Sequence, residues 1–133
     1  MCGIGGFFSP NPVPHAGTQL KKMAVAMKHR GPDGNGIYIR GPVGLVHTRL
    51  AILDLTEKAH QPMTDGKGGW LVYNGEIYNF RELREELKAL GYRFHSSGDT
   101  EVLLHAMREW GPSASRVCEA GSPSAGLTVK NWY

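Results

Sequence analysis

The sequence predicts an α+β fold. A short apolar run at the start is followed by one amphipathic segment, then by several short strand-like runs, and finally by two more amphipathic segments. Apolar residues spaced three and four apart indicate helices, whereas short apolar runs bounded by turn residues indicate strands. Glycine makes up 18 of the 133 residues. That content favours turns and close backbone approaches over a plain helical bundle.

The first half of the chain holds most of the predicted strands. Residues 3–8 (GIGGFF) predict a buried strand that begins at the terminus itself. A helix is expected from about Thr18, and the turn sequence HRGPDG, from His29, ends it. The helix is predicted by the spacing of Leu20, Met23, Ala24 and Met27. Further strands are predicted over residues 36–40, 43–47, 49–55 and 70–73, with a turn at TDGKGG, residues 64–69.

Two helices are predicted in the second half. Asn79 can cap the first, with Glu82 three residues later in a capping-box position, and Gly91 is a natural left-handed stop. Its expected buried stripe is Phe80, Leu83, Leu87 and Leu90. A short strand over residues 92–95 precedes the second helix, which is predicted by Leu103, Ala106, Met107 and Trp110.

Residues 112–133 differ in composition from the rest. They contain eight Gly, Pro or Ser residues in 22 positions and show no helical or strand period. Such a segment is expected to be a loose, disordered tail. We therefore predict one domain over residues 1–111, followed by this divergent tail.

Charge and composition disfavour several functional classes. The net charge is only +3 and there is no long basic run, so nucleic acid is not an expected partner. No apolar stretch approaches the ~18 residues of a membrane span, and the opening residues lack the features of a signal peptide. Two cysteines without a secretion signal favour a reduced, cytoplasmic protein. The six histidines never approach a second His or Cys at ligand spacing, so no metal site is expected.

Cys2 is the first candidate for chemistry. If the initiator Met1 is removed, Cys2 carries both a thiol and a free α-amine. An α-amine titrates near ~7.7–8.0, so it can accept the proton of the thiol, directly or through water. The alternative is an incidental thiol in the first strand.

Asn74-Gly75-Glu76 follows the strand at residues 70–73. A strand that ends in Asn-Gly is typical of a hairpin turn. The functional alternative uses the Asn74 amide and the Gly75 backbone N–H as two donors of an oxyanion hole.

Charged residues beside predicted strand ends and turns form a third set. Arg49 can clasp a carboxylate, while Glu76 and Asp99 can bind an ammonium, which together would recognise the head group of an amino acid. The alternative is three separate surface charges. His29 is a conceivable general base, but no nucleophile lies near it in the sequence.

These segments occur together in a known family. MCGIGGF at the start, HRGPDG, HTRLAILDL, QPM, NGEIYNF and GDTEVLL resemble the glutaminase domain of class II glutamine amidotransferases. The forms HRGPD, RLAILD and NGEIYN most resemble asparagine synthetase of the glutamine-hydrolysing type. The resemblance covers residues 1 to about 111 with the motifs in the family's order.

The resemblance implies an N-terminal-nucleophile hydrolase fold, a sandwich of two antiparallel sheets flanked by helices. It implies Cys2 as the nucleophile that attacks the side-chain amide of L-glutamine, and Asn74 with Gly75 as the oxyanion hole. It also implies Arg49 at the substrate carboxylate, and Glu76 and Asp99 around the α-ammonium. The products would be glutamate and ammonia, formed through a thioester. In the family a C-terminal synthetase domain uses the ammonia with ATP, magnesium and aspartate.

The chain also departs from the family pattern. It contains no pyrophosphate loop of the Ser-Gly-Gly-Leu-Asp type, so no ATP or magnesium site is expected in these 133 residues. After REWGP the expected apolar segment is replaced, which is the basis for expecting a truncated copy with an incomplete sandwich. Two alternative functions stay open: a non-catalytic remnant and the glutaminase part of another class II amidotransferase. Whether the chain forms a homodimer through this domain also stays open.

Overall fold

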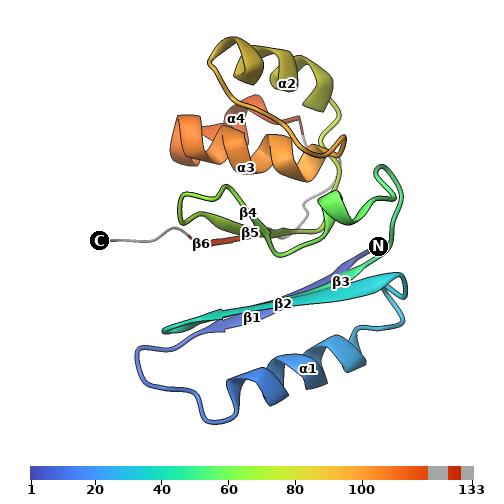
Figure 1. Cartoon of the computed structure of the whole chain (residues 1–133), viewed down its shortest axis with the longest axis vertical. Helices are drawn as coiled ribbons and strands as arrows, with labels where there is room; N and C mark the ends of the chain where they lie inside the picture. The colour runs from blue at the N-terminus through green and yellow to red at the C-terminus, as the bar shows by residue number, and fades with distance from the viewer. Residues whose placement is uncertain (120–125, 130–133) are drawn as a thin grey trace.

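Two antiparallel sheets lie between helical layers. The computed structural model describes residues 1–119 and 126–129 of the chain. From one side to the other, the layers are α1 (Ala16–Ala26), a first sheet, a second sheet, and a group formed by α2 (Phe80–Ala89), α3 (Asp99–Trp110) and α4 (Ala114–Val117) (Figure 1). The predicted sandwich of two antiparallel sheets flanked by helices is confirmed in these residues.

The first sheet has the order β1-β3-β2. Its strands are β1 (Gly3–Phe8), β2 (Gly34–Arg40) and β3 (Val43–Arg49). The central strand β3 is buried along its whole length because it pairs on both sides and is covered on both faces. Its even-numbered residues face α1, where Val46 packs on Leu20 and Ala24. The odd-numbered residues face the second sheet, since side chains alternate along a strand.

The second sheet has the order β4-β5-β6. Its strands are β4 (Met63–Thr64), β5 (Trp70–Tyr73) and β6 (Gly126–Val129), and β5 is central. Between the sheets lies an apolar layer, with Tyr38 stacked on Trp70 at a ring-centroid distance of 3.9 Å. The buried members of this layer are Val43, Leu45 and Val72, with Ile4 packed against them.

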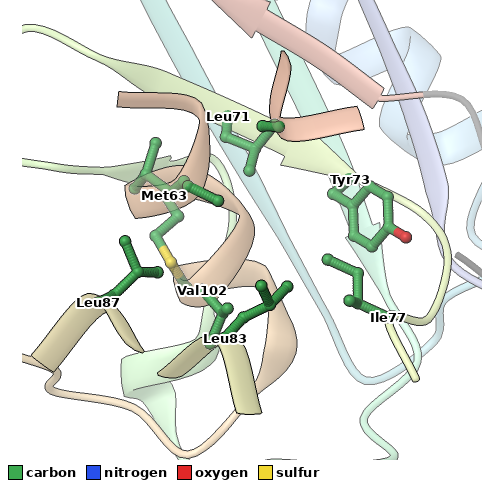
Figure 2. Packing of buried hydrophobic residues seen from close by; sticks show 10 residues of the cluster. Met63, Leu71, Tyr73, Ile77, Leu83, Leu87 and Val102 are labelled. Carbon is green, nitrogen blue, oxygen red and sulfur yellow. The ribbon is translucent and has the colours of Figure 1, made fainter. Parts of the chain in front are cut away.

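The outer face of the second sheet carries the largest core cluster. Helix α3 (Asp99–Trp110) lies between this sheet and α2 (Phe80–Ala89), so it is buried on two sides (Figure 1). Leu71 and Tyr73 of β5 point into this core together with Ile77 and side chains of both helices (Figure 2). Burial on two sides explains why Val102 and Leu104 are buried, although they lie outside the predicted apolar stripe of α3.

Two predicted strands are wrong. Residues 50–55 form a loop in which Ile52, Leu53 and Leu55 are more than half exposed. The loop is favoured because the backbone carbonyls of Asp54 and Thr56 accept hydrogen bonds from the Arg49 side chain, as described below. Residues 92–95 also form no strand. There the backbone N–H of His95 and of Ser96 is satisfied by the Glu101 carboxylate instead of by a neighbouring strand.

Details of the helix ends also differ from the predictions. Helix α2 begins after Asn79 as expected, but the Asn79 side chain makes no cap. Instead it donates to the Val117 carbonyl and accepts from the Glu119 N–H. At the other end Gly91 has a φ of 95°, as a left-handed stop requires, whereas Leu90 is 52% exposed and leaves the expected stripe.

The segment beyond residue 111 contains regular structure where it is described. Gly111–Ser113 form a 3₁₀ turn, Ala114–Val117 form the short helix α4, and β6 pairs antiparallel with β5. The expected absence of regular structure is therefore wrong for these residues. Ala114 is buried in the core cluster. Contacts with the rest of the protein therefore stabilise this helix, although its sequence shows no helical pattern of apolar residues. The remaining tail positions, 120–125 and 130–133, lie outside the described residues.

Candidate active site

Strand alternation brings the predicted site residues together between the sheets. Gly3 pairs with Thr48 and Ile4 with His47, so Cys2 stands opposite Arg49 at the end of the first sheet. Both face the second sheet, as Ile4 and Leu45 do. On β5, Val72 faces the first sheet, and Asn74 two residues later continues that face. The nucleophile candidate and the donor candidate thus come from opposite sheets.

A cavity of about 490 Å³ lies at this place. It is lined by all six residues that the sequence predicted for the site: Cys2, Arg49, Asn74, Gly75, Glu76 and Asp99. Its other walls include Met1, Arg30, His47, Asp54, Gln61 and Thr100, and the apolar loop of residues 50–53. This volume is in the range of small-molecule sites.

The Cys2 thiol is held at the start of this loop. The Leu50 backbone N–H donates to Cys2 Sγ over 3.3 Å, and Sγ lies 3.6 Å from the Leu50 carbonyl oxygen. Arg30 Nε donates to the Cys2 carbonyl over 3.3 Å. Both cysteines of the chain, Cys2 and Cys118, are free thiols. The sulfur therefore lies on the cavity wall with a backbone donor beside it.

The turn HRGPDG fixes the position of Arg49 and of the loop after it. Gly31 packs directly on β3, where an added Cβ would lie 2.3 Å from the Thr48 carbonyl carbon, so no larger residue fits without a shift. The Asp33 N–H donates to the Arg49 carbonyl, and Asp33 Oδ2 accepts from the Ala51 N–H, each over 2.9 Å. His29 itself is exposed and does not line the cavity. The turn thus has a structural use, and its own Arg30 also reaches the site.

The Arg49 side chain is buried and already engaged in part. One terminal nitrogen donates to the Thr56 carbonyl over 2.9 Å and the other to the Asp54 carbonyl. A guanidinium has five N–H donors, so these two bonds leave capacity for a further acceptor in the cavity. Arg49 therefore shapes the loop and presents positive charge to the cavity at the same time.

The Asn74-Gly75 turn is anchored on both sides. Tyr73 before it and Ile77 after it point into the core on the outer face of the second sheet (Figure 2). The Tyr73 N–H donates to Gln61 Oε1, and Gln61 Nε2 donates to Thr100 Oγ1 over 3.2 Å. A buried side chain therefore takes the place of a strand partner at the end of β5. Asn74 and Gly75 can therefore face the cavity while the Tyr73 N–H keeps a hydrogen-bond partner.

Two carboxylates form an acidic wall. Asp99 is buried at the start of α3, and its Oδ2 accepts from the Ile77 N–H over 3.0 Å. Burial raises the pKa of Asp99, and the nearby Glu76 carboxylate raises it further. A bound cation would relieve this repulsion, so the pair is suited to an ammonium group.

Several cavity residues were not singled out from the sequence. His47 lies two residues before Arg49 on the same face of β3, so alternation from Arg49 would have pointed to it. Gln61 belongs to the QPM motif, although its part in bracing β5 has no local signal. Asp54 falls within the strand predicted over residues 49–55, where the structure has a loop.

No metal centre or membrane segment emerges from the described residues. Within 1–119 and 126–129, no three His, Cys, Asp or Glu side chains gather as a metal would need. Over the same residues, no helix has the length and apolar character to cross a membrane.

Comparison with known proteins agrees with this arrangement. The family described as "Glutamine amidotransferase domain" matches residues 1–120. Among curated proteins, asparagine synthetase [glutamine-hydrolyzing] 1 of Bacillus subtilis is 41% identical over 119 residues, which cover 86% of this chain and 19% of that protein. Asparagine synthetase B of Escherichia coli is 38% identical, over 84% of this chain and 20% of that protein. The chain thus spans about a fifth of these relatives.

Solved structures show the same fold. The glutamine phosphoribosylpyrophosphate amidotransferase of B. subtilis, complexed with ADP and GMP, matches with a TM-score of 0.74 and 19% identity. The match covers 98% of this chain and 35% of that one. A second structure, described as the allosteric regulatory enzyme of purine biosynthesis, matches with a TM-score of 0.71, also at 19% identity, over 97% of this chain and 35% of that one. At this identity the match concerns the fold alone.

Proposed function

Because the chain belongs to the glutamine amidotransferase domain family, we propose that it hydrolyses the side-chain amide of L-glutamine, with Cys2 as the nucleophile. The observation that carries this proposal is the cavity. Six residues from both sheets and from α3 line it together, and their chemistry fits the two ends of glutamine. The products are glutamate and ammonia.

The amino-acid head group binds through charge. The Arg49 guanidinium takes the α-carboxylate, for which a guanidinium is well suited because it can offer two parallel donors. Glu76 and Asp99 take the α-ammonium, because a positive charge there offsets the burial of Asp99 and its repulsion from Glu76, which together raise the pKa of Asp99. The side chain of glutamine then extends toward the wall that carries Cys2.

The reaction begins with proton transfer. After removal of Met1, the free α-amine of Cys2 accepts the thiol proton, directly or through a water molecule. The sulfur attacks the amide carbon, and the resulting oxyanion accepts hydrogen bonds from the Asn74 amide and the Gly75 N–H. When the C–N bond breaks, the α-ammonium of Cys2 returns the proton to the leaving nitrogen of the substrate amide. Ammonia departs and a thioester stays on Cys2, which water hydrolyses to glutamate and the free thiol.

The use of the ammonia is a second part of the proposal. The curated relatives at 38–41% identity are named as glutamine-hydrolyzing asparagine synthetases, whereas the amidotransferase structures are only 19% identical. We therefore infer that this domain supplies ammonia for asparagine formation from aspartate by a synthetase part. ATP and magnesium belong to that part and not to the residues of this chain, which require no cofactor for glutamine hydrolysis.

The test is release of glutamate by the Met1-processed chain at saturating glutamine. We expect Cys2→Ala to abolish it and Cys118→Ala to leave it unchanged, because Cys118 is the other free thiol and does not line the cavity. Equal rates for the unaltered chain and Cys2→Ala would overturn the proposal. A chain that melts cooperatively and releases no glutamate would instead support a non-catalytic module.

A further inference from the structure

His47 is a buried histidine with no use in the fold. It lies in the middle of the first sheet on β3 and is only 1% exposed. Neither ring nitrogen has a hydrogen-bond partner among residues 1–119 and 126–129, and both atoms are inaccessible to solvent. An unsatisfied buried polar group costs roughly 1–3 kcal/mol. A residue that carries this cost in a packed sheet needs an explanation.

His47 is among the residues that line the cavity described above. His47 pairs with Ile4 of β1, so Cys2, two residues before Ile4, is its diagonal neighbour on the same face. Diagonal neighbours on adjacent strands are about 7–8 Å apart, which leaves room for one ligand group between them. On its own strand, His47 separates the apolar Leu45 from Arg49. It therefore marks the place where the apolar layer gives way to the polar cavity.

The ring is neutral at physiological pH. Burial is the main cause that lowers the pKa of His47 to about 4, and the positive charge of Arg49 and the neighbouring His60 lower it further. A neutral imidazole has one nitrogen that donates and one that accepts. His47 thus holds an uncharged acceptor in the wall of the cavity, which a turn of the ring would present to a ligand.

In the proposed function the other groups around the cavity already have partners. Asn74, Gly75 and Arg49 donate to oxygen atoms of the ligand, and the Glu76 and Asp99 carboxylates take its α-ammonium. Gln61 uses its oxygen for the Tyr73 N–H. The Asp54 carboxylate accepts from Thr56 and Ser97, and the Leu50 carbonyl faces the Cys2 thiol. A bound carboxamide also carries an NH₂ group, and a buried N–H requires an acceptor.

We propose that His47 is a substrate-binding residue whose ring nitrogen accepts a hydrogen bond from the side-chain NH₂ of glutamine, an inference that rests on the proposed function. The contact gives the site a means to prefer glutamine over glutamate, since the product carboxylate has no N–H to offer. Loss of that contact after C–N cleavage would assist release of glutamate.

The test measures binding in a chain that cannot turn over. In the Cys2→Ala background, calorimetric titration compares L-glutamine and L-glutamate for the parent, His47→Leu and His47→Gln. We expect His47→Leu to weaken glutamine binding about tenfold and glutamate binding less than threefold. His47→Gln restores an acceptor and should return glutamine binding to within about threefold of the parent. His29→Leu, a histidine outside the cavity, should match the parent.

The outcomes separate this inference from the proposed function. Unchanged glutamine affinity in His47→Leu, beside Cys2-dependent hydrolysis in the unaltered chain, overturns the role of His47 alone. Equal weakening of glutamine and glutamate also overturns it, because a merely structural residue would affect both. Failure of the parent to bind glutamine at all overturns both proposals. If His47→Leu does not melt cooperatively, His47→Phe replaces it in the same comparison.

Discussion

Ser97 is joined to Asp54 by two hydrogen bonds across 43 positions of the chain. The Ser97 N–H and hydroxyl donate to Asp54 Oδ2 over 2.8 and 3.0 Å. The other oxygen, Oδ1, accepts from the Thr56 N–H and hydroxyl over 2.8 and 2.6 Å. Led by the Thr56 hydroxyl, these bonds hold the pKa of Asp54 well below its usual range. One carboxylate thereby ties the loop that surrounds Arg49 to the segment that precedes Asp99.

Replacement of Asp54 by Ala should therefore loosen two walls of the cavity at once. We expect a loss of at least about 2 kcal/mol in unfolding free energy, because four donors lose a charged acceptor. The Michaelis constant for glutamine should also rise, since the loop positions Arg49. Thermal melts and glutaminase kinetics check this. Asp54→Asn keeps part of the hydrogen bonding, so its stability and its Michaelis constant should lie between those of the unaltered chain and of Asp54→Ala. An unchanged melting temperature in Asp54→Ala would contradict the prediction.

Arg49→Leu should weaken substrate binding more than it slows the saturated reaction. A hydrogen bond to a charged group contributes roughly 1.5–3 kcal/mol, so we expect a rise of about 10- to 100-fold in the Michaelis constant. The turnover number at saturating glutamine should fall much less, because the head group is remote from the bond that breaks. Steady-state kinetics on the folded fraction provide the measurement.

The matched control is Arg49→Lys, which keeps the charge but loses the planar fork. It should recover part of the affinity. If Arg49 serves the fold alone, Arg49→Leu will lower the melting temperature and leave the Michaelis constant of the folded chain unchanged.

Asn74→Ala should act mainly on the chemical step. Removal of one oxyanion-hole donor typically costs about 10²- to 10³-fold in turnover. The Michaelis constant should change little, and Asn79→Ala supplies the control. Asn79 lies five residues later, and its side chain bonds to the backbone of Val117 and Glu119, away from the cavity. A comparable loss of turnover in both variants would point to general damage to the fold.

Glu101 predicts the response of the fold to acid. Burial raises its pKa, but the His105 imidazole, whose Nε2 lies 3.7 Å from Glu101 Oε1, and hydrogen bonds from Ser96 and His95 outweigh this and lower the pKa to about 2. The folded state therefore favours the ionised form. The resulting stability is fully present above the unfolded pKa, near 4.5, and is lost as the pH falls from there toward 2.

A Glu101→Gln variant should consequently be less stable at pH 7, by on the order of 2–3 kcal/mol, and its stability should vary less between pH 5 and 3. Denaturant titrations at several pH values measure both effects. Glu85, an exposed residue of α2 paired with Lys88, is the control position, and Glu85→Gln should be nearly neutral. Parallel acid curves for the unaltered chain and Glu101→Gln would refute the assignment.

Patterns within single elements could be predicted from the sequence. The strand at Gly3–Phe8 has the expected bounds, and α1 and α3 follow from their helical spacing. Contacts between segments far apart in the chain could not be predicted from the sequence. The apolar run at residues 49–55 has the composition of a strand, yet β3 ends at Arg49. The Arg49 side chain donates to the backbone carbonyls of Asp54 and Thr56, which fold back around it as a loop. Likewise, Glu101 outcompetes strand pairing for the N–H groups of residues 95 and 96.

The candidate site shows the same division. Cys2, Arg49, Asn74, Gly75, Glu76 and Asp99 could be named from local patterns and from the family resemblance, and they line one cavity. Strand alternation from Arg49 places His47 on the same face, but a histidine in an apolar strand has many ordinary explanations. Its burial without a partner is the added signal, and that burial depends on the docking of the second sheet.

The two halves of the proposed reaction centre belong to different sheets. Cys2 immediately precedes β1 of the first sheet, and Asn74 immediately follows β5 of the second. The sheets meet through a thin apolar layer around Val43, Leu45 and Val72. Glutamine hydrolysis would then depend on the spacing between two layers rather than on either one. A change that slides or parts the sheets would silence the reaction while each sheet kept its own hydrogen bonds. Enzymatic activity would consequently reveal such a displacement before circular dichroism did.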